Sequence, residues 1–155
     1  MKKALSLVLV AIMVFAFTAC GGGESKESDN VIKIGDYQAV YKESKLVKDS
    51  DGNDAIAITY DYTNNSEQAQ SFNWAFYIDI KQGEKVLEYA PVFVSEDSFD
   101  MLDDAMGTDV NPGETLEVTT TYMLSDLTTP IEIKYSDLFD EKTDSLTIDM
   151  STVEK

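Results

Sequence analysis

The sequence predicts an all-β fold, an antiparallel β-sandwich of about seven or eight short strands. Apolar and polar residues alternate with period two in several runs, and Gly-, Asn- and Asp-rich turn sequences separate these runs. Such alternation gives each strand one buried face, as in antiparallel sheets. About 125 residues follow the N-terminal segments, enough for one domain with its own core.

The first strand region spans residues 31–47. Its alternation up to Tyr41 is out of step with Leu46, and a bulge within Lys42–Lys45 would reconcile the two halves. Asp51-Gly52 follows this region and is a strong signal for a hairpin turn.

Further alternating runs occupy residues 56–63, 72–80, 116–124, 131–135 and 146–150. In the second of these, Phe72, Trp74 and Phe76 share one face, so we expect Trp74 at the aromatic centre of the core. Asn73 and Tyr77 would then lie on the other face, available for surface contacts. Turns are expected at 64–66, 82–84 and 111–113, from their Asn, Gly and Pro residues.

The long interruption at 91–111 holds one candidate partner-binding site. Ser95 could cap a short helix whose apolar face carries Phe99, Leu102 and Met106, and this pattern favours a lid packed on one end of the sandwich. Alternatively, the loop binds a partner through apolar and acidic side chains, for which the candidates are Phe99, Met101, Asp103 and Asp104.

The acidic loop at 49–54 is a second candidate, for Ca²⁺. Its oxygen-bearing residues are Asp49, Asp51, Asn53 and Asp54. An EF-hand needs Gly at position six and Glu at position twelve, where this chain has Asp54 and Tyr60. The pattern therefore favours a tight turn, with a cation site outside the EF-hand class as the alternative. The acidic residues at 137–144 are interpreted as a solvated loop.

The N-terminus has the pattern of a secretory signal over residues 1–19. Met1-Lys2-Lys3 is followed by an apolar run that ends at Phe17-Thr18-Ala19-Cys20. This ending resembles the lipobox of bacterial prolipoproteins, which implies cleavage before Cys20 and a diacylglyceryl group on its thiol. The alternative is an ordinary secretory signal with a cysteine near its cleavage site. Residues 20–30 are then a Gly- and Ser-rich tether, and 31–155 the domain.

Localisation and composition limit the function classes. The resemblance to a lipobox implies that the protein lies on the extracytoplasmic face of the cell membrane, held by its lipid. The chain has no histidine or arginine and a net charge of −17. Removal of the two signal lysines leaves ten lysines against 29 acidic residues, a net charge of −19. Nucleic-acid binding needs clustered basic residues and is excluded.

The residue types present also argue against an enzyme. Without histidine there is no Ser-His-Asp triad or histidine-ligated metal, and lipidation leaves no free thiol, since Cys20 is the single cysteine. We therefore expect no enzymatic activity and no cofactor beyond the lipid. A carboxylate-pair glycan hydrolase is the remote alternative. The acidity favours solubility, or a cationic partner.

Three segments carry a family resemblance: Ile56 to Ser66, Phe72 to Phe76 and Asn111 to Val118. They resemble the uncharacterised immunoglobulin-like domains that follow the tether in Gram-positive lipoproteins. The resemblance covers roughly residues 31–151 and implies an immunoglobulin-like sandwich. By association it also implies a binding or accessory module that engages a protein or peptide of the envelope.

Overall fold

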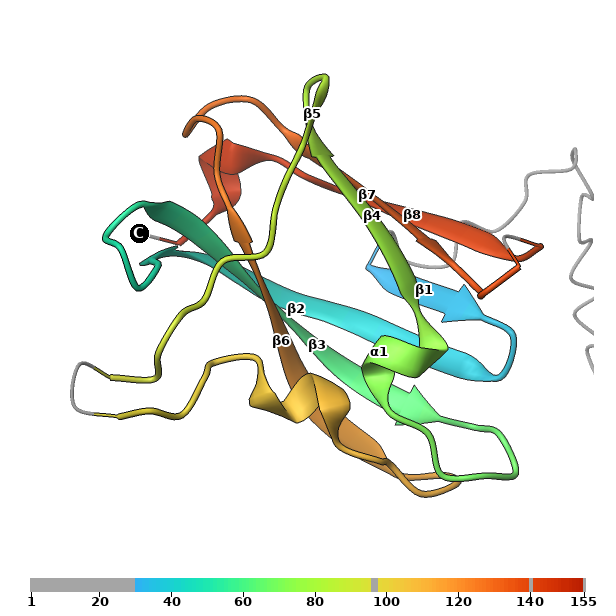
Figure 1. Cartoon of the computed structure of the whole chain (residues 1–155). Helices are drawn as coiled ribbons and strands as arrows, with labels where there is room; N and C mark the ends of the chain where they lie inside the picture. The colour runs from blue at the N-terminus through green and yellow to red at the C-terminus, as the bar shows by residue number, and fades with distance from the viewer. Residues whose placement is uncertain (1–29, 96–97, 140, 155) are drawn as a thin grey trace, which may run out of the picture.

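Two four-stranded antiparallel sheets pack face to face in the computed structural model, which describes residues 30–95, 98–139 and 141–154. The first sheet consists, in spatial order, of β1 (Val31–Ile34), β2 (Tyr37–Lys48), β3 (Asp54–Asn64) and β6 (Thr115–Met123). The second consists of β5 (Lys85–Val86), β4 (Tyr77–Gln82), β7 (Ile131–Ser136) and β8 (Thr143–Ile148). Figure 1 shows the two layers, and the predicted sandwich of about seven or eight strands is confirmed, with eight strands in the described residues.

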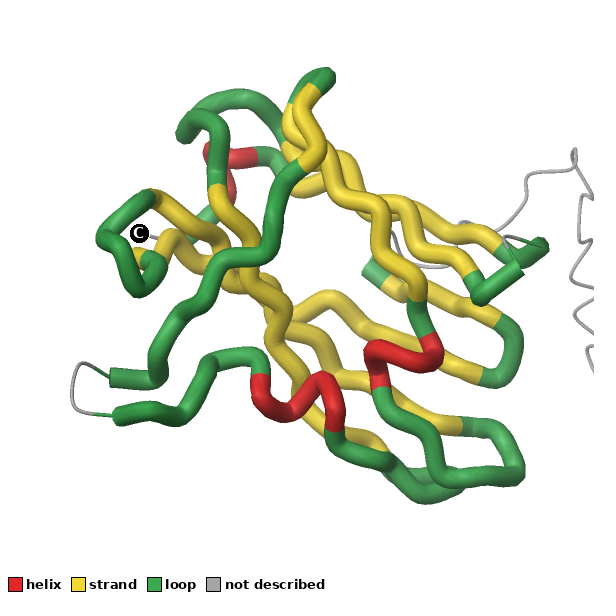
Figure 2. The backbone as a smooth tube through the Cα atoms, viewed as in Figure 1, coloured by secondary structure: helices red, strands yellow, loops and turns green. Residues whose placement is uncertain are grey.

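Helical structure in the described residues is limited to short turns (Figure 2). They are α1 (Phe72–Ala75) and the 3-10 turns η1 (Asp104–Gly107) and η2 (Met150–Thr152). The last run predicted as a strand therefore ends at Ile148, and Met150 begins η2 while remaining buried.

The predicted bulge lies in β2. Tyr41 pairs with Tyr60 and Glu43 pairs with Thr59, which leaves Lys42 as the extra residue. The bulge restores the inward orientation of apolar side chains on both sides of it.

A hairpin that sequence analysis missed divides the first strand region. β1 and β2 are joined by Gly35 and Asp36, with Gly35 at φ +60°. The available signals were the Gly35-Asp36 pair and the change of the apolar positions from even to odd numbers between Ile34 and Tyr37. The predicted Asp51-Gly52 hairpin is confirmed between β2 and β3, with Gly52 at φ +84°.

Aromatic rings from both sheets form the centre of the core. Phe72 stacks on Tyr60 with ring centroids 5.6 Å apart, and Tyr135 of the second sheet meets Tyr60 edge-on at 6.2 Å. The hydroxyl oxygens of Tyr60 and Tyr135 lie 2.7 Å apart in a buried hydrogen bond. Isoleucines of β1, β3 and β7 surround these rings: Ile32, Ile34, Ile56, Ile58, Ile131 and Ile133.

The expectation for Trp74 is wrong: its side chain is 71% exposed. The chain makes one helical turn here, in which Ala75 N–H donates to Ser71 O at 3.0 Å and Phe76 N–H donates to Phe72 O at 3.0 Å. Helical spacing turns Phe72, Ala75 and Phe76 inward together, and Trp74 outward. Tyr77 then begins β4 on the solvent side, 61% exposed, as predicted.

Candidate functional site

Residues 87–107, here called the excursion, leave the second sheet after β5 and run along the free edge of β6 (Figure 1). Ala90 N–H donates to Thr121 O at 3.2 Å, and Met123 N–H donates to Glu88 O at 2.8 Å. The excursion therefore occupies the edge of β6 that would otherwise be open to another strand.

The base of the excursion packs on the outer face of the first sheet. Ala90 and Val92 form a second buried cluster with Ala55 of β3. Half-buried Val47, Leu102 and Met123 pack against this cluster. Main-chain bonds hold the base as well, since Ser50 N–H donates to Pro91 O at 2.8 Å and Leu102 N–H donates to Val92 O at 2.8 Å.

The predicted helix over 95–106 is wrong in its described part. The two arms of the excursion pair with each other instead: Phe93 bridges to Met101, and Val94 N–H donates to Asp100 O at 3.0 Å. Only η1 is helical, and the positions 96 and 97 lie outside the described residues. Arm pairing satisfies main-chain groups that a helix would otherwise have bonded internally.

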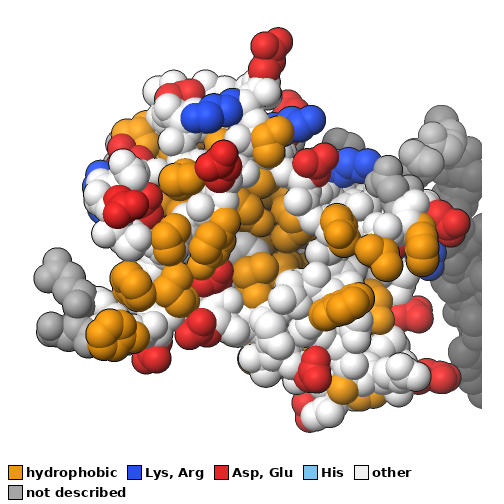
Figure 3. Space-filling view, in the orientation of Figure 1, with side chains coloured by type: hydrophobic (Ala, Val, Ile, Leu, Met, Phe, Trp, Pro, Cys, Tyr) orange, Lys and Arg blue, Asp and Glu red, His pale blue; other side chains and the backbone are white. Residues whose placement is uncertain are grey.

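Phe99 is consequently not part of a packed lid, since 95% of its side chain is exposed. Leu102 and Met106 are half-buried, so the three residues expected on one packed face are separated. The exposed apolar side chains of the excursion are here called the excursion surface: Tyr89, Phe93, Val94 and Phe99, with half-buried Met101. Figure 3 shows hydrophobic side chains gathered over this part of the molecule, with acidic residues beside them.

Carboxylates flank the excursion surface. Residues 87–109 contain seven acidic residues and no lysine or arginine. Tyr89 Oη donates to Asp103 Oδ1 at 3.2 Å, and burial together with the nearby Asp103 raises the pKa of Tyr89. Asp104 Oδ2 accepts from Met101 N–H at 3.1 Å. The predicted partner-binding residues Phe99, Met101, Asp103 and Asp104 therefore share one excursion, and their binding role stays a prediction.

The structure uses Asp49 to close the β2–β3 turn. Its Oδ1 accepts from Asp51 N–H at 2.9 Å and Asn53 N–H at 2.8 Å, and its Oδ2 accepts from Asn53 Nδ2 at 3.0 Å. These bonds, led by the Asn53 side chain, lower the pKa of Asp49. Both carboxylate oxygens already have donors within the loop.

Asp54, another predicted Ca²⁺ ligand, pairs with Lys48 instead, with Nζ 2.8 Å from Oδ1. In the described ranges, no group of three or more acidic side chains is arranged to hold a metal ion. Ca²⁺ binding by Asp49, Asp51, Asn53 and Asp54 stays a prediction, tested below.

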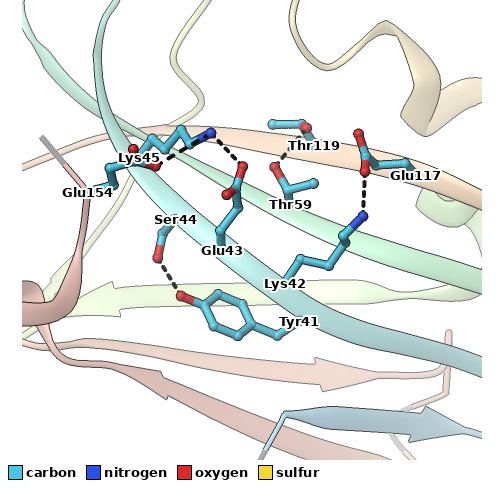
Figure 4. Close-up of polar contacts among 9 residues, drawn as sticks. All are labelled: Tyr41, Lys42, Glu43, Ser44, Lys45, Thr59, Glu117, Thr119 and Glu154. Carbon is cyan, nitrogen blue, oxygen red and sulfur yellow. Dashed lines mark hydrogen bonds and ion pairs between the residues drawn. The ribbon is translucent and has the colours of Figure 1, made fainter.

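The uncovered part of the outer face of the first sheet is a ladder of matched polar side chains (Figure 4). Lys42 Nζ lies 2.6 Å from Glu117 Oε2 and 3.2 Å from Asp61 Oδ1. Bonding to Glu117 and then Asp61 raises the pKa of Lys42, and bonding to Lys42 lowers that of Glu117. Further partners on this face are Lys45 with Glu43 and Glu154, and Thr59 with Thr119. Because these groups satisfy one another, this face offers little to a ligand.

The residues 137–144, interpreted as a solvated acidic loop, also carry an apolar feature that sequence reasoning missed. Leu138 is 59% exposed and Phe139 is 78% exposed, in the turn between β7 and β8. Two adjacent large apolar residues within an acidic turn were the available signal. Of the acidic groups, Asp137 Oδ1 accepts from Glu141 N–H and Asp144 Oδ2 from Lys33 N–H, both at 2.9 Å, while position 140 lies outside the described residues.

The predicted signal peptide, the lipidated Cys20 and the tether up to residue 29 lie outside the described residues. Across the described ranges, the helices are all too short or too polar to cross a bilayer.

Two solved structures share the fold. One, described as "a putative lipoprotein from Staphylococcus aureus subsp. aureus NCTC 8325", has a TM-score of 0.61 at 21% identity, over 81% of this chain and 97% of that chain. The other, a protein from Enterococcus faecalis, has a TM-score of 0.55 at 20% identity, over 77% of this chain and 90% of that chain. No curated protein matches the sequence.

A family model also matches the sequence itself, over residues 22–137. That range contains the excursion and seven of the eight strands, from β1 to β7. The chain therefore belongs to the family of DUF5067, a domain of unknown function.

Proposed function

We propose that the protein is a lipid-anchored binding or accessory module of the cell envelope, whose excursion surface binds a cationic, amphipathic segment of a peptide or protein. One observation carries this proposal: Phe99, Val94 and Phe93 are exposed within residues 87–109, which contain seven acidic residues and no basic one. A partner with apolar side chains beside lysines or arginines would match both features.

The geometry of the excursion supports a binding role in two ways. Its base is fixed by the buried cluster of Ala90, Val92 and Ala55, so the apolar side chains project from an ordered support. Its carboxylates would raise the encounter rate with a cationic partner, while burial of Phe99 and Val94 would add a hydrophobic contribution to the affinity.

The location rests on the N-terminal sequence. The apolar signal ending in Cys20 supports a lipid anchor on the extracytoplasmic face, and the description of the S. aureus neighbour agrees with it. The same signal and the lack of histidine support a role without enzymatic chemistry.

We further propose that the sandwich is of the immunoglobulin-like type. The order β2-β3-β6 corresponds to A-B-E of that fold, and β5-β4-β7-β8 corresponds to C′-C-F-G. The excursion and η1 occupy the connection in which a constant-type domain has strand D. A topology of this type supports a binding role by association alone.

Site-specific crosslinking in intact cells tests the proposed function. A photo-crosslinking amino acid at position 99 is expected to capture a protein or peptide. The matched control is position 127, where Leu127 is 48% exposed in a different loop. Equal crosslinking at positions 99 and 127 would contradict the proposal.

A purified system then tests the partner chemistry. The lipoprotein in detergent is titrated with a model amphipathic peptide of leucine and lysine, at low and high salt. Phe99→Ser should weaken binding about tenfold. Asp103→Asn with Asp104→Asn should reduce its salt dependence. Phe139→Ser, a change of the same kind at another exposed site, should leave binding unchanged.

A further inference from the structure

The single tryptophan of the chain is displayed at the surface by a local departure from the strand pattern. Trp74 is 71% exposed, while its neighbours Phe72, Ala75 and Phe76 are buried. A continued strand would have placed Trp74 in the core beside Phe72 and Phe76. The one-turn helix α1 therefore leaves the largest side chain in the protein exposed, without the stabilisation that its burial would have contributed.

Two shallow hollows flank Leu138 next to this tryptophan. One, of about 220 Å³, is lined by Trp74, Tyr37 and Leu138 among others. The other, of about 410 Å³, is lined by Tyr77 and Leu138. Leu138 therefore forms a ridge between an indole and a phenol that are both more than half exposed. Figure 3 shows hydrophobic side chains over this region too, separate from those over the excursion.

The hollows lie at the end of the sandwich opposite the base of the excursion, whereas η1, the last turn of the excursion, lies beside α1. The first includes Gly35 and Asp36 of the β1–β2 turn, whereas the base of the excursion bonds to Ser50 in the turn at the far end of β2.

Charge in the hollows is nearly balanced, unlike that of the excursion. Three carboxylates (Asp36, Asp79, Asp137) and two lysines (Lys134, Lys142) line them. Asp79 and Lys134 are direct cross-strand partners on β4 and β7. Lys142 lies over Gly35, with Nζ 3.2 Å from where a Cβ on that glycine would be. This balance gives little preference for a charged ligand.

We propose that this surface binds a neutral saccharide chain. Sugar rings present apolar C–H faces, which stack on exposed aromatic rings, and hydroxyl groups, which both donate and accept hydrogen bonds. Trp74 and Tyr77 provide two stacking positions on either side of Leu138. The surrounding carboxylates accept from sugar hydroxyls and the lysines donate to them. The mixture of exposed aromatic rings with nearby charges of both signs fits such a ligand better than it fits a cationic peptide.

Fluorescence of Trp74 reports on this surface directly, because the chain has no other tryptophan. The mature lipoprotein is held in a polyoxyethylene detergent without sugar groups and titrated with chitotetraose, cellotetraose and maltotetraose. Binding of at least one of these, with a Kd of about 1 mM or tighter, should protect Trp74 from quenching by acrylamide.

Matched variants localise the binding. Tyr77→Ala should weaken it about tenfold by fluorescence, and Trp74→Ala should do the same by calorimetry. Phe99→Ala, at the other end, should leave it unchanged, so the proposal can fail or succeed independently of the proposed function. Thermal melting checks that the exposed substitutions leave the fold intact.

Three outcomes would overturn the proposal. The first is no protection of Trp74 by any of the three sugars up to about 10 mM. The others are unchanged binding in both Tyr77→Ala and Trp74→Ala, and protection by the model cationic peptide alone.

Discussion

The buried hydroxyl pair of Tyr60 and Tyr135 connects the two sheets through a polar contact in an aromatic core. The oxygens are 2.7 Å apart, and burial raises the pKa of both phenols, so both remain protonated at physiological pH. One hydroxyl donates and the other accepts. Loss of either leaves its partner buried without its bond, which costs more than loss of both.

We therefore expect Tyr60→Phe and Tyr135→Phe each to lower the free energy of unfolding by about 1–3 kcal/mol, and the double variant to lower it by less than their sum. Urea unfolding measures all three, with Tyr77→Phe as the exposed control. Additive losses would show that the hydroxyls do not act as a pair.

Asp126 should account for part of the loss of folding stability at low pH. Its Oδ1 accepts from Thr129 N–H and Thr128 N–H, both at 2.7 Å, and these bonds lower its pKa from 3.8 to about 2. A carboxyl whose pKa is depressed by folding stabilises the native state above its unfolded pKa. That contribution is lost as the pH falls from about 4 to about 2. Asp126→Asn should flatten the stability profile in that window, as thermal melts at successive pH values would show, and an unchanged slope would contradict this.

Single residues also show what periodicity could not predict. Phe72 and Phe76 share one face in either a strand or a helical turn, because they are four residues apart, whereas Trp74 joins that face only in a strand. Tertiary packing selected the turn, since Phe72 and Phe76 reach the rings of Tyr60 and Tyr62 from α1. The burial of those two aromatics was predictable, and the exposure of Trp74 between them was not.

At the scale of elements, the excursion is a hairpin with a packed base and an exposed end. One of its valines lies in the base and another lies on the exposed end. Val92 is 4% exposed in the cluster with Ala90 and Ala55, whereas Val94 is 60% exposed on the excursion surface. Val92→Ala should lower the free energy of unfolding by about 1–3 kcal/mol, and Val94→Ala by less than about 0.5 kcal/mol. The two are compared by urea unfolding. Equal losses would mean that the excursion is not divided into a packed base and an exposed end.

The strands were predictable because their alternation depends on burial against a single opposing sheet. The excursion was predictable as an interruption, and its residues Phe99, Met101, Asp103 and Asp104 were identified as candidates. Its internal structure was not, because the helical spacing of Phe99, Leu102 and Met106 competes with the main-chain pairing of two arms. That pairing depends on the edge of β6, which is distant in the sequence.

At the scale of the whole molecule, the two ends of the sandwich differ in charge and in the chemistry they display. The excursion end is apolar and anionic, and the end with Trp74 and Tyr77 is aromatic with near-balanced charge. Crosslinking at position 99 tests the excursion surface, and quenching of Trp74 tests the saccharide surface. Because the two residues lie at separate ends, each experiment tests one proposal independently of the other.

Net charge gives the last prediction. The chain has twelve lysines against 29 acidic residues, so repulsion among carboxylates opposes the compact state and salt should relieve it. We expect NaCl to raise the melting temperature. At matched ionic strength we expect Ca²⁺ and Mg²⁺ to act alike, because Asp49 is occupied by loop donors and Asp54 by Lys48. Thermal melts in the three salts measure this, with Asp51→Ala as the loop variant. An additional shift with Ca²⁺ alone, abolished by Asp51→Ala, would instead establish the turn at 49–54 as a calcium site.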